Sequence, residues 1–152
     1  MNLTAIAALG ILAVLLAGCC CITSSSLAEN KSDPYQSFYG QKAAVSSTFE
    51  LTLEKYSERL STDNTKTVTV TFTATNSGTE QDDVNGGLFI SDEQGRNYEA
   101  NMFACSTLIN PGLSKKIDCE FYEVPPSTKI VAVKMGDSIF NKGSYTKLFD
   151  LQ

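Results

Sequence analysis

Apolar and polar residues alternate along most of the chain after residue 42. In the clearest stretch, TVTVTFTATN at 67–76, threonines fill every second position, and the apolar residues between them are Val68, Val70, Phe72 and Ala74. A period of two is typical of a strand with one face in the core and the other toward water, and branched threonine suits the pleated surface. The stretch therefore predicts a core strand with a solvated threonine face.

Further short strands follow from the same alternation and from the turn residues between them. Over 48–56 the inward face holds Phe49, Leu51 and Leu53, and other strands are expected at 87–91, from 96, at 114–124, at 129–135 and at 145–151. Turn signals stand at Asn76-Ser77-Gly78, at 92–95, at Asn110-Pro111-Gly112 and at Pro125-Pro126. About seven or eight strands with a turn roughly every 8 to 12 residues indicate a sandwich. The sequence predicts an all-β fold, an immunoglobulin-like antiparallel β-sandwich, over 43–152.

The order of these segments resembles a known domain family. A TxTFTATNSG strand, a DEQGRNY hairpin, an INPGLS turn and the segment FYEVPPSTKIVAVKM look like the telokin-like, immunoglobulin-fold family of unknown function found in secreted lipoproteins of bacteria and archaea. The resemblance covers residues from about 49 to 148. It implies that Phe121, Val124 and Pro125 cap the sandwich, although an extra Tyr122-Glu123 pair lengthens the spacing here.

Residues 3–22 carry no charge and are almost wholly apolar, as in the hydrophobic part of a signal segment. The sequence Leu16-Ala17-Gly18-Cys19 resembles the lipobox of bacterial and archaeal lipoproteins. This resemblance implies that residues 1–18 are removed as a signal peptide and that Cys19 is lipidated. Two or more acyl chains, such as palmitate, anchor durably because each buried methylene contributes roughly 0.8 kcal/mol. The mature protein is then expected on the extracytoplasmic face of the cell membrane.

Two features of this segment leave an alternative open. No Lys or Arg precedes the apolar run to orient it, and Cys20 and Cys21 add further thiols. About 20 apolar residues also suffice to span a bilayer as an uncleaved helix. The chain is therefore expected at a membrane, either as a lipoprotein, which we favour, or as a membrane-anchored subunit.

Residues 19–42 are expected to form the lipidated N-terminus and a flexible linker. They are rich in Ser, Asn, Asp and Gly and show no hydrophobic period. Their aromatic residues, Tyr35, Phe38 and Tyr39, are predicted to be loose rather than docked on the domain. An Asn-X-Ser sequon begins at Asn30, and its use depends on whether the organism glycosylates such sites.

Composition excludes several kinds of partner and reaction. The net charge is −5, which disfavours nucleic acid because that binding depends on Lys and Arg. Histidine is absent, so Ser-His-Asp and Cys-His pairs and His-ligated metal sites are excluded. We therefore expect a protein that is not an enzyme and has no cofactor, with a hydrolase that uses carboxylates alone as the alternative.

Cys105 and Cys119 are the cysteines of the predicted sandwich. An exported domain meets oxidising conditions in which an even pair usually forms a disulfide. We expect a structural bridge, because a redox pair would have Cys-x-x-Cys spacing. Two buried free thiols are the alternative.

Acidic residues gather in two successive loops, with Glu80, Asp82 and Asp83 in the first and Asp92 and Glu93 in the second. If a sandwich brings both loops to one end, their oxygens have the chemistry to hold calcium. No EF-hand spacing is present, so a solvated acidic surface is favoured. Asp82, Asp83, Asp92 and Glu93 are weak candidate ligands.

Taken together, these patterns predict a noncatalytic lipoprotein of the cell envelope with a binding or structural β-sandwich. Its expected partners, besides the membrane, are an envelope protein, a polysaccharide or a small ligand reached through loops at one end. The alternative is a calcium-dependent adhesion or sensing domain.

Overall fold

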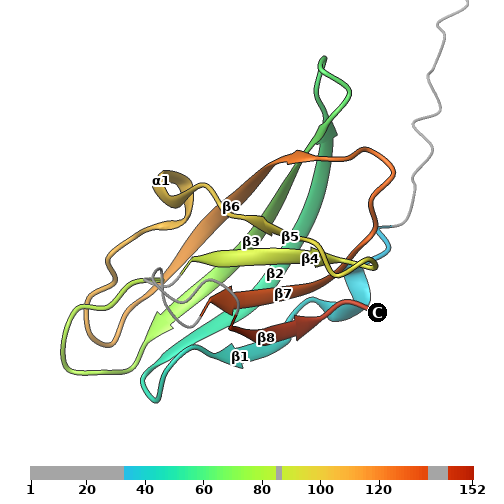
Figure 1. Ribbon diagram of the computed structural model, residues 1–152. Coiled ribbons are helices and arrows are strands. Elements are labelled where there is room, and N and C mark those ends of the chain that lie inside the picture. The colour runs from blue at the N-terminus through green and yellow to red at the C-terminus, as the bar shows by residue number, and fades with distance from the viewer. Residues whose placement is uncertain (1–32, 85–86, 137–143) are drawn as a thin grey trace, which may run out of the picture. The chain divides into compact units, whose positions relative to one another are not determined.

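The described part of the chain, residues 33–84, 87–136 and 144–152 of a computed structural model, contains two four-stranded antiparallel sheets. The first has the order β1 (Lys42–Ala44), β2 (Phe49–Leu60), β3 (Lys66–Asn76), β6 (Ser114–Val124). The second has the order β5 (Asn97–Glu99), β4 (Leu88–Asp92), β7 (Ile130–Gly136), β8 (Tyr145–Asp150). The helices of this part are η1 (Gln36–Phe38) and α1 (Met102–Cys105), and Figure 1 shows the arrangement. The predicted all-β sandwich is confirmed.

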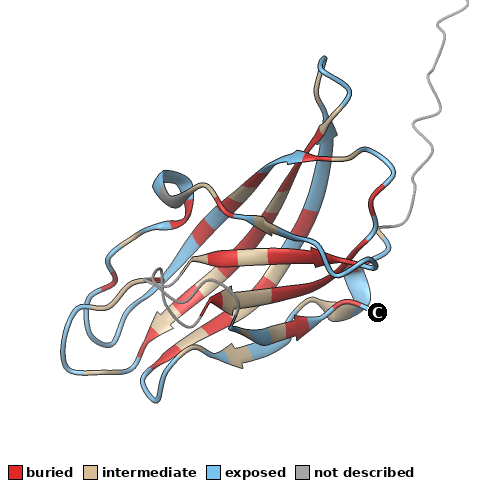
Figure 2. Ribbon diagram, viewed as in Figure 1, coloured by how far each residue is buried: buried red, intermediate tan, exposed pale blue. Residues whose placement is uncertain are grey.

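The core lies between the two sheets and is filled by the alternating apolar residues. All four apolar side chains of β3 are fully buried, as the alternation predicts. Phe72 of β3 stacks on Phe149 of β8, with 5.7 Å between ring centroids, so the two sheets pack on each other. Burial of such a side chain contributes about 1.5 to 3 kcal/mol. Figure 2 shows the buried positions recurring along the strands.

The threonine face of β3 is less exposed than predicted. Thr67 and Thr71 count among the buried residues, and Thr71 is 9% exposed. The reason is that β3 lies between β2 and β6, whose side chains cover this face from both sides. The Thr71 hydroxyl donates a hydrogen bond to Asp118 on β6 at 2.6 Å, so its burial leaves no polar group unsatisfied.

Strand β2 extends past its predicted end at Tyr56 to Leu60. Its inward residues up to Leu53 are buried as predicted, and then the register shifts between Leu53 and Lys55. A β-bulge inserts one extra residue and so reverses which alternate positions face the core. This is why Tyr56 is buried, and why a simple period of two fails at this point.

The sandwich begins earlier than the expected boundary at residue 43. Tyr35 is only 5% exposed, and its hydroxyl donates to the Ile130 carbonyl on β7 at 2.9 Å. Its ring lies 4.1 Å from that of Tyr56. The prediction that Tyr35, Phe38 and Tyr39 are loose is therefore wrong, because Phe38 and Tyr39 are also partly buried against the core. Strand β1 already pairs with β2 from Lys42.

Candidate functional site

One edge of each sheet meets the other along a seam between β5 and β6. Ala100, just after β5, forms an isolated antiparallel bridge with Phe121 of β6. The Asn101 backbone N–H donates to the Glu120 carbonyl at 2.8 Å. These contacts join the two sheets on this side and fix the segment that leads into α1.

Helix α1 is held at both of its ends. At its start, the Asn101 side chain accepts a hydrogen bond from the Phe103 N–H at 3.1 Å, in the manner of a helix cap. At its end, Cys105 forms a disulfide with Cys119 on β6, in agreement with the predicted pairing. Both cysteines are buried, yet Phe103 between these two attachments is 95% exposed. A fixed backbone thus presents a large aromatic side chain to solvent.

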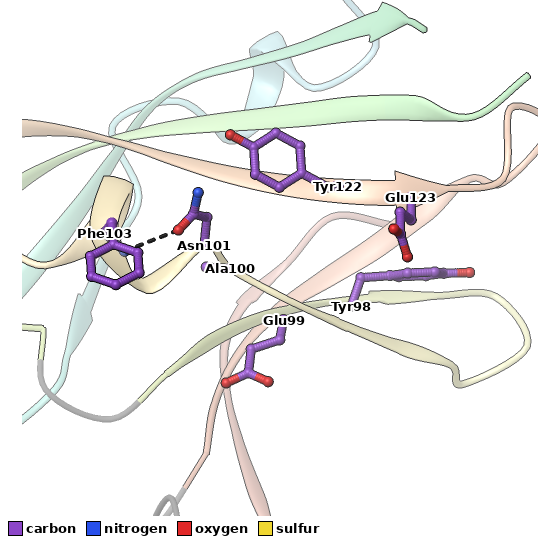
Figure 3. Close-up of a pocket in the computed structure, with 7 residues that line it drawn as sticks. All are labelled: Tyr98, Glu99, Ala100, Asn101, Phe103, Tyr122 and Glu123. Atoms are coloured by element: carbon purple, nitrogen blue, oxygen red, sulfur yellow. Dashed lines mark hydrogen bonds between the residues drawn. The ribbon is translucent and has the colours of Figure 1, made fainter. Parts of the chain in front are cut away.

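A groove of about 690 Å³ follows the seam. We call it the seam groove, and its lining residues are Tyr98, Glu99, Ala100, Asn101, Phe103, Tyr122 and Glu123. In Figure 3 the Asn101 amide lies between the rings of Phe103 and Tyr122, the Glu123 carboxylate lies beside the Tyr98 ring, and Glu99 points the other way. Sequence reasoning missed this site, since its residues come from two different sheet edges.

A β-bulge in β6 shapes the floor of the seam groove. Two residues, Tyr122 and Glu123, stand opposite one residue of β3, because Phe121 pairs with Val68 and Val124 with Lys66. Glu123 has a φ of 57°, a left-handed conformation that few residues other than glycine adopt. As a result Tyr122 and Glu123 are both exposed on the seam.

The lining of the seam groove is negatively charged. Glu99 and Glu123 belong to it, whereas no Lys or Arg does. Next to it, Glu120 accepts a hydrogen bond from the Tyr122 hydroxyl. Within the described ranges, no hydrogen bond or ion pair engages the carboxylates of Glu99 and Glu123. Among the described residues, the groove therefore offers the unpaired Glu123 carboxylate beside an aromatic ring, whereas the Glu99 carboxylate points away from the rings (Figure 3).

Behind the groove, Asp92 holds the β4–β5 hairpin together. It accepts a hydrogen bond from the Tyr98 hydroxyl at 3.0 Å and an ion-paired one from Arg96 Nε at 2.6 Å. Burial alone would raise the pKa of Asp92, but the bonds from Arg96 and Tyr98 outweigh it and hold the pKa below its usual range. Burial, together with the hydrogen bond to this carboxylate, raises the pKa of Tyr98. Asp92 is therefore an ionised structural residue that orients Tyr98.

The structure does not bring the two acidic loops together. Asp82 forms an isolated bridge with Ile109 before β4 begins, whereas Asp92 and Glu93 lie at the opposite end of β4 (Figure 1). Glu93 pairs with Lys129 at 3.1 Å, and Asp92 is engaged by Arg96. Among the described residues, no group of three or more Cys, Asp or Glu side chains is placed to hold a metal ion. The weak calcium candidates Asp82, Asp83, Asp92 and Glu93 are thus split between two ends of the sandwich.

Other predicted sites fall outside the described residues. These are Cys19 with its neighbours Cys20 and Cys21, the signal segment, and the sequon at Asn30. Within residues 33–84, 87–136 and 144–152, no helix has the length and apolar character needed to cross a membrane.

Comparisons with known proteins support the fold. No protein-family model matches this chain, and no curated protein sequence matches it. An uncharacterized β-sandwich protein from Clostridium difficile 630 is similar in structure, with a TM-score of 0.50 and 10% identity over 72% of this chain and 89% of that one. A conserved hypothetical protein from Bacillus anthracis has a TM-score of 0.46 and 15% identity, over 72% of this chain and 96% of that one. The first likeness shows a β-sandwich and nothing about activity.

Proposed function

We propose that this chain is a noncatalytic protein of the cell envelope, anchored to the extracytoplasmic face of the membrane by lipid on Cys19, whose β-sandwich binds a partner through the seam groove. The observation that carries the binding role is Phe103, which is 95% exposed although its helix is tied to β6 by a disulfide. Exposure of a large aromatic side chain on fixed backbone is a common property of binding sites, because little conformational entropy is lost when a partner covers it.

The seam groove has the composition of a recognition site. Three aromatic side chains line it together with one amide and two carboxylates, so apolar contact area and polar groups that fix orientation are both present. Helix α1 lies at the other end of the sandwich from η1 (Figure 1). Residue 33, at which the described part of the chain begins, therefore lies away from Phe103.

The anchor is tested by the intact mass of the protein extracted from membranes, compared with a Cys19→Ser variant. We expect the wild type to lack residues 1–18 and to carry acyl mass, and the variant to keep those residues without lipid. A wild-type protein that retains residues 1–18 and carries no lipid would overturn the anchor and favour an uncleaved helix.

The binding role is tested in whole cells with a photoreactive phenylalanine analogue placed at position 103 of the full chain. The matched control carries the analogue at Leu60, which is 72% exposed at the far end of β2. We expect a discrete covalent adduct from position 103 and none from position 60. The same adducts from both positions, or none from either, would contradict the proposal. So would turnover of a substrate by the purified protein that is abolished by Glu99→Gln or Glu123→Gln.

A further inference from the structure

We infer that the partner of the seam groove is a basic segment of another envelope protein, which places one Lys or Arg side chain against Phe103 and Tyr122 and a second one beside Glu123 and Tyr98. This inference rests on the proposed function and names the chemistry of the partner. It follows from the open aromatic faces, from the charge of the lining and from the shape of the groove.

The aromatic rings of the groove are available to a cation. Phe103 is 95% exposed and Tyr122 is 44% exposed, and neither ring packs on another aromatic ring within the described residues. In Figure 3 their rings lie on either side of Asn101. The face of an aromatic ring carries partial negative charge and attracts an ammonium or guanidinium group within about 6 Å.

The charges of the groove select a cation over an anion or a neutral ligand. Glu99 and Glu123 lack protein partners in the described part of the chain, and Glu120 stands next to Tyr122. A neutral sugar would cover these carboxylates without compensating their charge, which costs free energy as water is displaced. A guanidinium donates two parallel hydrogen bonds to a carboxylate and stacks on an aromatic face at the same time.

The shape of the groove favours a chain segment over a single small cation. The groove is open and about 690 Å³ in volume, and it runs along the seam from Phe103 on α1 to Tyr98 on β5. A small amine would fill little of that length, whereas an extended segment places successive side chains along it. Glu123 beside Tyr98 and Asn101 between Phe103 and Tyr122 form two separate positions for such side chains (Figure 3).

The test uses the full-length protein in detergent and a short peptide of alternating glycine and arginine with one tryptophan. Because the chain has no Trp, tryptophan fluorescence reports the peptide alone. We expect saturable binding that weakens as salt is added, and about tenfold weaker binding of the same peptide with citrulline in place of arginine. Equal binding of the arginine and citrulline peptides would overturn the inference.

Variants then locate the peptide on the groove. Glu123→Gln is expected to weaken binding about fivefold, and Phe103→Leu, which keeps apolar bulk but removes the ring face, about threefold. The matched control is Glu54→Gln, a carboxylate on β2 outside the groove, which should bind as the wild type does. Equal losses in the control and the groove variants would overturn the inference.

A neutral N-acetylglucosamine oligomer distinguishes failure of this inference from failure of the proposed function. If the oligomer binds and Phe103→Leu weakens it, the groove is a binding site for sugar and only the basic partner is wrong. If the photoreactive residue at position 103 also yields no adduct in cells, the binding function itself fails. We expect no binding of the oligomer.

Discussion

Two aromatic groups of this protein use similar side chains in opposite ways. Tyr35 and Tyr56, which are buried, and Tyr39, which is partly buried, form what we call the buried tyrosine cluster at the start of the described chain, whereas Phe103 and Tyr122 are exposed on the seam groove. In the buried tyrosine cluster every hydroxyl has a protein partner. Tyr35 donates to the Ile130 carbonyl at 2.9 Å, Tyr56 to Glu58 at 2.5 Å and Tyr39 to Asp33.

The pKa values of the buried tyrosine cluster reflect this environment. Burial is the largest cause that raises the pKa of all three tyrosines, and the nearby carboxylates of Glu58 and Asp33 raise them further. These hydroxyls stay neutral and hold the segment from Asp33 against the sheets. An aromatic residue in a polar stretch of sequence is therefore structural when its ring and its hydroxyl both find partners, and it stays available for binding when they do not.

Truncation of one ring from each aromatic group should affect stability very differently. Tyr35→Ala removes a buried ring and its hydrogen bond and should lower the free energy of unfolding by about 4 kcal/mol. Phe103→Ala removes a ring that contacts mainly solvent and should change it by less than about 0.5 kcal/mol. Urea unfolding of both variants measures the difference. If both variants lose similar stability, Phe103 belongs to the core and the contrast between the two groups fails.

The disulfide between Cys105 and Cys119 should hold α1, and with it the exposed Phe103, in place at the seam groove. Replacing Cys105 and Cys119 by Ser removes a bridge with a sequence separation of 14, which should lower the free energy of unfolding by about 3 kcal/mol. Because the end of α1 is then no longer tied to β6, amide hydrogen exchange at Phe103 and Ala104 should become faster. Exchange in the buried tyrosine cluster, for example at the Tyr56 N–H, should change less. Unchanged exchange in α1 would show that the bridge does not hold Phe103 in place.

The local pattern of apolar, polar and turn residues was sufficient to predict most of the strands and turns. The alternation in β3 and the bounds of β6 match the structure, and the turns at Gly95 and Gly112 have φ values of 78° and 73° as turn chemistry requires. These features depend on residues close together in sequence. The disulfide could also be predicted, because Cys105 and Cys119 are the two cysteines of the predicted sandwich.

Features that depend on neighbours distant in sequence were not predictable. A period of two shows which residues share a face but not which strands flank it, so the half-buried threonines of β3 were missed. Tyr35 finds Ile130 and Tyr56 only in the folded chain, and its polar sequence context indicates a linker. The seam groove forms where β5 and β6 meet and where a β-bulge leaves Glu123 exposed. No residue pattern within either strand predicts that these two edges lie together.

The Tyr39 hydroxyl should contribute less to the free energy of unfolding than the Tyr35 ring does. Tyr39→Phe removes the oxygen that accepts a hydrogen bond from the Tyr56 N–H at 2.8 Å, which should cost about 1 kcal/mol at neutral pH. Burial, helped by the hydrogen bond to Asp33, raises the pKa of Tyr39 to about 12, whereas an unfolded tyrosine titrates near about 10.

Between these two pH values the unfolded state loses the Tyr39 proton while the folded state keeps it. The stability that this tyrosine contributes is therefore fully present below pH of about 10 and is lost as the pH rises toward about 12. The advantage of the wild type over Tyr39→Phe, measured by urea unfolding across this range, should shrink as pH rises. The matched control is Tyr122→Phe on the seam groove, which should stay within about 0.5 kcal/mol of the wild type at neutral pH. A constant difference between wild type and Tyr39→Phe across the range would mean that the hydroxyl is not held neutral in the fold, and the two aromatic groups would then differ in ring burial alone.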